Sequence, residues 1–150
     1  MDLHLDTLLH LPYVTVETCS YMDENVCLQI RFLNDGISCP NCDKYTEELH
    51  QVRSVLVRDL PVFGQQVYLK IPRRQFYCKA CQRYRTERLE FIDWERRHTQ
   101  RYEKHVYQQV KNSSIAQVSR EEKLSESEIK GIFDHQIQGL KKKTGANQNA

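Results

Sequence analysis

The sequence predicts a mixed α+β fold: an N-terminal β-hairpin and a four-cysteine zinc ribbon, followed by a three-helix, helix-turn-helix-like unit. Two Cys-x-x-Cys pairs lie roughly 35 residues apart, as the two halves of a zinc ribbon can. Strand-like alternation of apolar and polar residues fills the interval between them. From about Asp93 the apolar residues recur with a helical period, which marks the change from strands to helices.

The expected elements follow in order along the chain. Residues 3–11 have the apolar spacing of a short helix, and two strands are expected around the polar turn MDEN. The stretch 50–78 predicts two further strands joined at Asp59-Leu60-Pro61 and Gly64, because β-branched and aromatic residues fill it. Helices follow from Thr99, which is placed to cap the first of them. The expected domains are residues 1–34 (short helix and hairpin), 35–95 (zinc ribbon), 96–140 (helices) and 141–150 (flexible tail).

Charge is unevenly distributed, although the formal net charge is only +2. Residues 1–50 contain 2 Lys/Arg and 9 Asp/Glu, whereas residues 51–110 contain 13 Lys/Arg and 6 Asp/Glu. An acidic head followed by a basic middle favours nucleic-acid binding on one face. A solvated surface without a ligand is the alternative, since single-sign stretches often have no partner.

Neither a membrane span nor a secretory signal is predicted. The chain has no long uninterrupted apolar run, and its opening MDLHLDTLLHLPY carries Asp2 and Asp6 without a basic n-region. We therefore expect a cytoplasmic, reducing setting, in which paired cysteines indicate a metal before a disulfide.

Four cysteines predict one structural zinc ion. A Cys-x-x-Cys turn directs both sulfurs to one point, and two such turns complete a tetrahedron of thiolates. A redox pair or buried free thiols are the alternatives, but a thioredoxin-like pair needs a βαβ context that this stretch lacks. Four thiolates leave the metal no open position, which argues against zinc catalysis. The predicted ligands are Cys39, Cys42, Cys78 and Cys81.

The basic residues around the second pair have two predicted roles. Lys44, Lys79 and Arg83 lie next to the ligands in sequence, and we expect them to offset the negative charge of zinc bound to four thiolates. The other arginines of the stretch extend along the flanking strands and are expected to meet nucleic acid; they are Arg73, Arg74, Arg85 and Arg88. Cys19 and Cys27 are expected to be small buried residues rather than a disulfide.

The segment SSIAQVSREEKLSESEIKGIF, residues 113–133, has the order helix, short turn, second helix. Ser114 with Gln117, and Ser125 with Glu128, fit the capping box that opens a helix. Apolar side chains are expected to form one small core: Val106, Val110, Ile115, Val118, Leu124, Ile129 and Ile132. Such a unit places its second helix in the major groove of DNA. The exposed positions there are Glu126, Ser127, Lys130 and Gly131.

Three features of this segment oppose that interpretation. Lys123 stands where such turns usually have glycine, because the backbone there tends to need a positive φ. Gly131 inside the second helix costs up to ~1 kcal/mol relative to alanine. Several glutamates put negative charge on the motif, which phosphates repel. A plain helical bundle for packing or dimerisation is therefore the competing interpretation.

The ribbon resembles a known family in the motifs CPNC, VRDLP, RRQFYC and RTERL, taken in that order. These motifs resemble bacterial insertion-sequence transposases of the ISL-three type, and the opening LLHLPYVTVE is also similar to the start of those proteins. The resemblance covers roughly residues 8–135 and implies a zinc ribbon followed by a helix-turn-helix. Those transposases cut and join DNA with a ribonuclease-H-like domain that follows. This chain ends before any such domain, so we expect no enzyme activity.

Together these features predict sequence-specific binding of double-stranded DNA, resembling the end-recognition part of a transposase without its catalytic domain. Phosphate contacts are expected from Arg73, Arg74, Arg83, Arg85 and Arg88, and base contacts from Ser127 and Lys130. The alternative is a protein-interaction or dimerisation module, or a stand-alone transposase-derived regulator, in which the acidic head docks the basic middle of a second copy. RNA also stays open, because a basic strand surface with tyrosines suits either nucleic acid.

Overall fold

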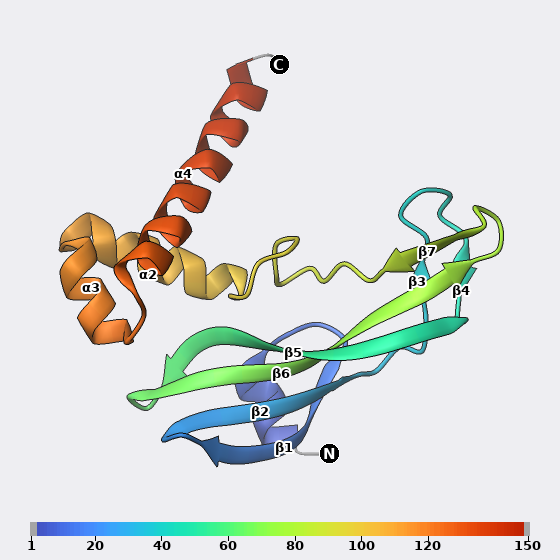
Figure 1. Cartoon of the computed structure of the whole chain (residues 1–150), viewed down its shortest axis with the longest axis horizontal. Coiled ribbons are helices and arrows are strands. Elements are labelled where there is room, and N and C mark those ends of the chain that lie inside the picture. Colours follow the sequence, from blue (N-terminus) through green and yellow to red (C-terminus); the bar gives the residue numbers. More distant parts are fainter. Residues whose placement is uncertain (1–2, 149–150) are drawn as a thin grey trace. The chain divides into compact units, whose positions relative to one another are not determined.

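The computed structural model describes residues 3–148, and the chain divides into two compact units, Met1–Thr99 and Gln100–Ala150. The first unit consists mainly of strands and the second of helices (Figure 1). This confirms the predicted mixed α+β class.

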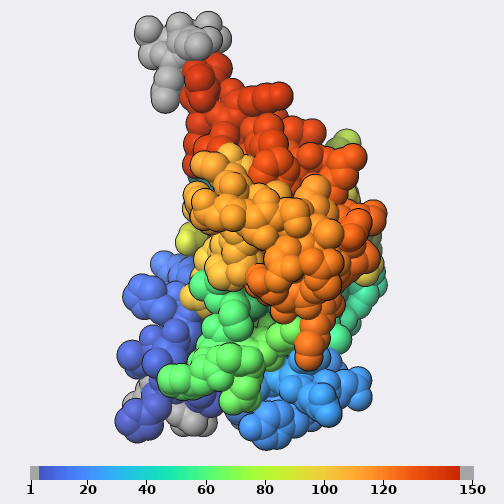
Figure 2. Space-filling view, turned by 90° about the vertical axis from the view of Figure 1, so that its left-hand side faces the viewer, coloured from blue at the N-terminus to red at the C-terminus, as the bar shows by residue number. Residues whose placement is uncertain are grey.

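The first unit is built on a five-stranded sheet with the order β1-β2-β6-β5, in which β7 also pairs with β6. Its strands are β1 (Val14–Met22), β2 (Asn25–Phe32), β5 (Leu49–Val62), β6 (Gln65–Cys78) and β7 (Arg83–Thr86). The sequential neighbours are antiparallel, whereas β2 runs parallel to β6, with Val26 beside Val67. The β1–β2 and β5–β6 turns therefore lie at the same end of the sheet. Figure 2 looks onto that end, with β5–β6 in green and β1–β2 in blue.

One hydrophobic core lies against this sheet and includes alternate residues of β2 and of the first half of β6, as expected for strands that bury one face. The helix α1 (Leu3–Leu9) contributes Leu9 to this core, and the segment after β7 contributes Phe91. Asp6 fixes α1 to β1, because its carboxylate accepts the Val16 backbone N–H at 2.7 Å and the Thr15 hydroxyl at 2.8 Å. Strands from the expected hairpin domain 1–34 and the expected ribbon domain 35–95 thus share one sheet and one core.

The β5–β6 turn lies at Gly64, the second of the two predicted breaks, and not at Asp59-Leu60-Pro61. β5 continues through Asp59-Leu60-Pro61 to Val62, and the register shifts between Asp59 and Val62. Pro61 has no N–H to give to the strand ladder, which fits an irregularity better than a regular pair. The turn itself is Phe63–Gly64, with φ of 52° and 73°. Cys27 is buried as expected, but Cys19 is exposed, which contradicts the expectation that both are buried.

The second unit has three helices, α2 (Gln100–Asn112), α3 (Ile115–Glu122) and α4 (Glu126–Gln148). Its centre is fully buried and consists of Tyr102, Val106, Val118, Ile129 and Ile132. α4 continues to Gln148, beyond residue 140, where the helices were expected to end; the lysines and alanine there are good helix formers. No helix in the described part of the chain is long and apolar enough to cross a membrane.

Candidate metal centre and nucleic-acid interface

Two turns bring the four cysteines of the ribbon together. Cys39 and Cys42 lie between the short strands β3 (Ile37–Ser38) and β4 (Tyr45–Thr46), whereas Cys78 ends β6 and Cys81 lies in the turn to β7. The first turn depends on Gly36, because a Cβ there would lie 2.3 Å from the Thr46 backbone oxygen. The residue that follows the second cysteine of each pair has a left-handed backbone. The two halves of the site are therefore built alike.

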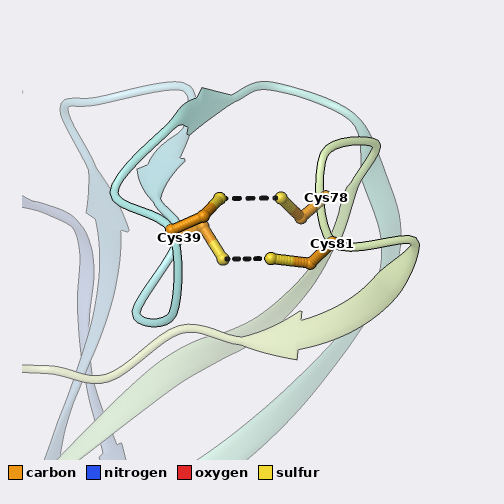
Figure 3. A group of neighbouring side chains, drawn as sticks. Cys39, Cys78 and Cys81 are labelled. Atoms are coloured by element: carbon orange, nitrogen blue, oxygen red, sulfur yellow. Dashed lines mark hydrogen bonds between the residues drawn. The ribbon is translucent and has the colours of Figure 1, made fainter.

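The sulfur atoms have the spacing that a zinc ion requires. Cys42 Sγ lies 3.6 Å from Cys78 Sγ. Cys39 Sγ lies 3.8 Å from Cys81 Sγ (Figure 3). All four sulfurs lie within 4.8 Å of one another. A tetrahedron with Zn–S bonds of ~2.3 Å has sulfur–sulfur edges of about 3.8 Å, so these positions fit it closely. The cluster is a site for one structural zinc ion, as predicted.

The four thiols differ in acidity. The backbone N–H groups of Cys42 and Asn41 lower the pKa of Cys39 to about 6. At Cys42 the Lys44 backbone N–H acts to lower the pKa, yet burial and the other three cysteines together raise it to about 12. The Asn41 side-chain amide donates to Cys81 Sγ at 3.3 Å and is the main cause that lowers the pKa of Cys81. Because zinc takes thiolates, metal binding must expel the protons that remain.

Arg85 is the arginine that interacts with the ligand sulfurs. A hydrogen bond to Cys81 is the main cause that raises the pKa of Arg85, and Cys39 adds to it. Arg83, which was expected to balance the charge of the site, is exposed at the start of β7. Lys79 is also exposed and lies 3.8 Å from a carboxylate oxygen of Glu48. We therefore propose that Arg85 acts at the metal site rather than in the DNA contacts.

Arg74 is held inside the sheet unit. Its Nε and one Nη donate to the two carboxylate oxygens of Glu87 at 2.9 and 2.8 Å, and the other Nη donates to the Asn34 backbone oxygen at 2.9 Å. The side chains of Arg74 and Glu87 are only 12% and 8% exposed. The guanidinium also lies over the rings of Phe32 and Phe76. Since its donors face protein acceptors, we leave Arg74 out of the DNA contacts as well.

Arg73 and Arg88 both lie against Trp94. Their guanidinium carbons are 5.0 and 4.4 Å from the centroid of the indole ring, which is within the range of a cation–π contact. Trp94 and Arg88 are exposed, and Arg73 is half-buried. Of the arginines predicted from sequence, Arg73, Arg83 and Arg88 thus keep side chains that a phosphate can reach.

The helical unit has the local geometry of a helix-turn-helix. The Ser114 hydroxyl accepts the Gln117 N–H at 3.1 Å, and the Ser125 hydroxyl accepts the Glu128 N–H at 3.1 Å, which confirms both serine caps. Lys123 between α3 and α4 has φ 56° and ψ 42°, so the turn needs a left-handed residue even though glycine is absent there. The four expected surface positions of α4 are all exposed: Glu126, Ser127, Lys130 and Gly131.

A buried acid in this unit was not predicted from the sequence. Glu122 is 6% exposed, and its carboxylate accepts the Tyr102 hydroxyl at 3.0 Å and lies 3.3 Å from His105 Nε2. The contact joins α2 to the end of α3. Residues that lie 20 positions apart give no local pattern, so no sequence signal could have revealed the contact.

A closed site of four thiolates in a strand-rich unit, followed by three helices with a capped turn, defines a zinc-ribbon and helix-turn-helix protein. Comparison with known proteins agrees: residues 35–81 match the zinc-finger of transposase IS204/IS1001/IS1096/IS1165, and residues 87–137 match the helix-turn-helix domain of transposase family ISL3. The chain thus carries two domains of ISL3-family transposases, the zinc ribbon and the helix-turn-helix.

The chain is also similar to a transposase for insertion sequence element IS1001 from Bordetella parapertussis. The two are 33% identical over 82 residues, which cover 55% of this chain and 20% of that protein. The matched segment thus corresponds to about a fifth of the relative's length. No solved structure matches the chain. The helix-turn-helix domain implies DNA binding, and neither matched domain is a catalytic one.

Proposed function

We propose that the chain binds double-stranded DNA in a sequence-specific manner, as the end-recognition region of an insertion-sequence transposase would. The observation that carries the proposal is the helical unit: α4 exposes Ser127 and Lys130 near its N-terminus while Ile129 and Ile132 are fully buried. In helix-turn-helix proteins the N-terminal residues of the second helix contact base edges in the major groove. The zinc site rigidifies the ribbon rather than reacting, since its four positions are filled by cysteine.

The negative charge near the start of α4 favours specificity for a base sequence more than it favours affinity for DNA. Glu126 and Glu128 oppose binding to phosphates, whereas a glutamate can accept a hydrogen bond from the amino group of cytosine. The favourable phosphate contacts are then assigned to the ribbon, where Arg73, Arg83 and Arg88 are accessible. Such contacts do not depend on base sequence and weaken as salt is added.

The test begins with selection of duplexes from a randomised pool by the zinc-loaded chain. We expect one preferred sequence, and we expect S127A and K130A each to lower the preference for it over a random duplex by about 5- to 150-fold, the value of one lost base contact. The matched control is D134A, which removes an exposed side chain further along the same helix and should leave the preference unchanged. Selection that enriches no sequence, at any salt concentration, would refute specific binding.

The second candidate is a protein-interaction or dimerisation module. Its supporting observation is a set of exposed apolar side chains on β5, Leu49, Val52 and Leu56, which are 44–50% exposed. Light scattering separates the two candidates: a dimer that forms without DNA, together with failure to bind any duplex, favours the second.

A further inference from the structure

A hollow of about 830 Å³ lies on the first unit, between the β5–β6 hairpin and residues 94–97. Its lining is strongly basic: Arg53, Arg73, Arg74, Arg96 and Arg97 contribute to it, and Glu95 is its acidic member. Of these arginines, Arg53, Arg96 and Arg97 belong to none of the sites described above. We call the hollow the arginine groove.

The walls of the groove are held in fixed positions. The Arg58 N–H of β5 donates to the Arg97 backbone oxygen at 2.9 Å, and the Thr99 N–H donates to the Arg58 oxygen at 2.9 Å. The segment that carries Arg97 therefore runs along the edge of β5. On the sheet side, the stacking of Arg73 on Trp94 limits the motion of a long side chain. A ligand would thus meet one guanidinium group, that of Arg73, which has already lost part of its freedom.

The positive charge in the groove is poorly compensated. Arg53 and Arg73 lie directly opposite each other on neighbouring antiparallel strands, and like charges in that position destabilise a sheet. Within residues 3–148, Arg53, Arg73 and Arg97 form no ion pair with a carboxylate; Arg74, by contrast, is neutralised by Glu87. An anion held between these side chains would remove the repulsion.

We propose that the arginine groove holds the sugar–phosphate backbone of the duplex DNA that α4 reads, whatever the base sequence at the groove. A phosphodiester backbone is favoured over a single small anion because several arginines, from both walls, line a large, open hollow. Only His98 and Thr99 separate Arg97 from the first residue of α2, so DNA bound by the helices is held at high effective concentration near the groove. The inference rests on the proposed function.

The experiment measures binding of the zinc-loaded full chain to a random duplex and to a selected duplex over a salt series. The variants are R53Q and R97Q, whose side chains are exposed and whose loss should not affect folding. The matched control is R31Q, which removes an exposed arginine from β2 of the same sheet, where Arg31 pairs with Glu17 at 3.3 Å. Thermal unfolding of each variant checks that the fold is intact.

We expect R53Q and R97Q each to weaken binding about three- to tenfold, equally for both duplexes. The plot of the logarithm of the association constant against log salt should become less steep by about 1 in each variant. The preference for the selected duplex should not change, and R31Q should have no effect on the slope. Unchanged slopes in R53Q and R97Q overturn the inference, as does an equal loss in R31Q, which would show a general charge effect.

Two further outcomes are informative. A loss seen with an unpaired oligonucleotide but not with the duplex would overturn the assignment to duplex DNA. Failure of the unmodified chain to bind any DNA overturns the proposed function itself, whereas binding that depends on Lys130 but not on the groove arginines overturns this inference alone.

Discussion

Replacement of Arg74 by alanine should remove much of the stability of the sheet unit. The substitution leaves the Glu87 carboxylate, which is 8% exposed, without the two short hydrogen bonds that it accepts at 2.9 and 2.8 Å. Breaking a buried ion pair by removal of one partner costs about 3–5 kcal/mol, since the remaining charge stays buried. A single domain is stable by roughly 5–15 kcal/mol in total, so R74A takes away a large share.

Urea unfolding of the zinc-loaded chain measures this loss, and the double variant R74M/E87L provides the decisive comparison. With both charges gone and similar volume in place, stability should return to within about 1–2 kcal/mol of the original, because apolar replacement of a buried pair is often neutral. R73Q is the matched control, since Arg73 has no carboxylate partner among the described residues, and it should cost under about 1 kcal/mol.

The two arginines should also differ in DNA binding. R73Q should lower the salt dependence of binding, whereas R74M/E87L should leave it unchanged. The reasoning is refuted if R74A costs less than about 1 kcal/mol, or if R74M/E87L is as unstable as R74A. It is refuted too if R74M/E87L folds normally but loses the same salt dependence as R73Q.

Three other perturbations have definite expected outcomes. Zinc binding should release protons at neutral pH, because Cys42, with a pKa of about 12, is still protonated, whereas Cys39, with a pKa of about 6, is already a thiolate. Zinc affinity should therefore rise with pH. Calorimetry in buffers of different ionisation enthalpy measures the released protons, and binding without proton release would contradict the prediction. G131A should stabilise the helical unit by about 0.5–1 kcal/mol in thermal unfolding, since a Cβ placed at residue 131 would meet no atom within 4 Å outside its own stretch of helix. A loss of stability would show that the position is strained. Y102F should destabilise that unit by about 1–3 kcal/mol, because the buried Glu122 loses a donor, and an unchanged midpoint would contradict the contact.

Features with short sequence spacing were predictable. The two Cys-x-x-Cys pairs indicated the metal site because a turn of that length fixes the direction of both sulfurs, whatever fills the interval. The caps at Ser114 and Ser125 were predictable for the same reason, since each acts on a backbone N–H three residues away. The left-handed turn at Lys123 followed from motif geometry, even though the residue type argued against it.

Features that depend on pairing between distant strands were not predictable. The sequence suggested phosphate contacts for Arg74 and Arg85, and it could not show their protein partners, because only the fold brings Glu87 to Arg74 and the ligand sulfurs to Arg85. Arg53 gave no signal at all; it became notable only once the register set it opposite Arg73. The sequence likewise could not show that residues 1–34 and the ribbon share one core, since that depends on the parallel pairing of β2 with β6.

That parallel pairing has a consequence for how the protein can be cut. A chain begun at residue 35 would contain the complete zinc-finger match, yet β6 would lose its neighbour and present unpaired backbone groups along an open edge. The core would also lose its residues from β2 and α1, which are buried together with Val67, Leu69 and Ile71. Such a fragment should bind zinc and still aggregate. The metal holds the end of β6 that carries Cys78, but it does not cover the strand edge near Val67, where β2 paired.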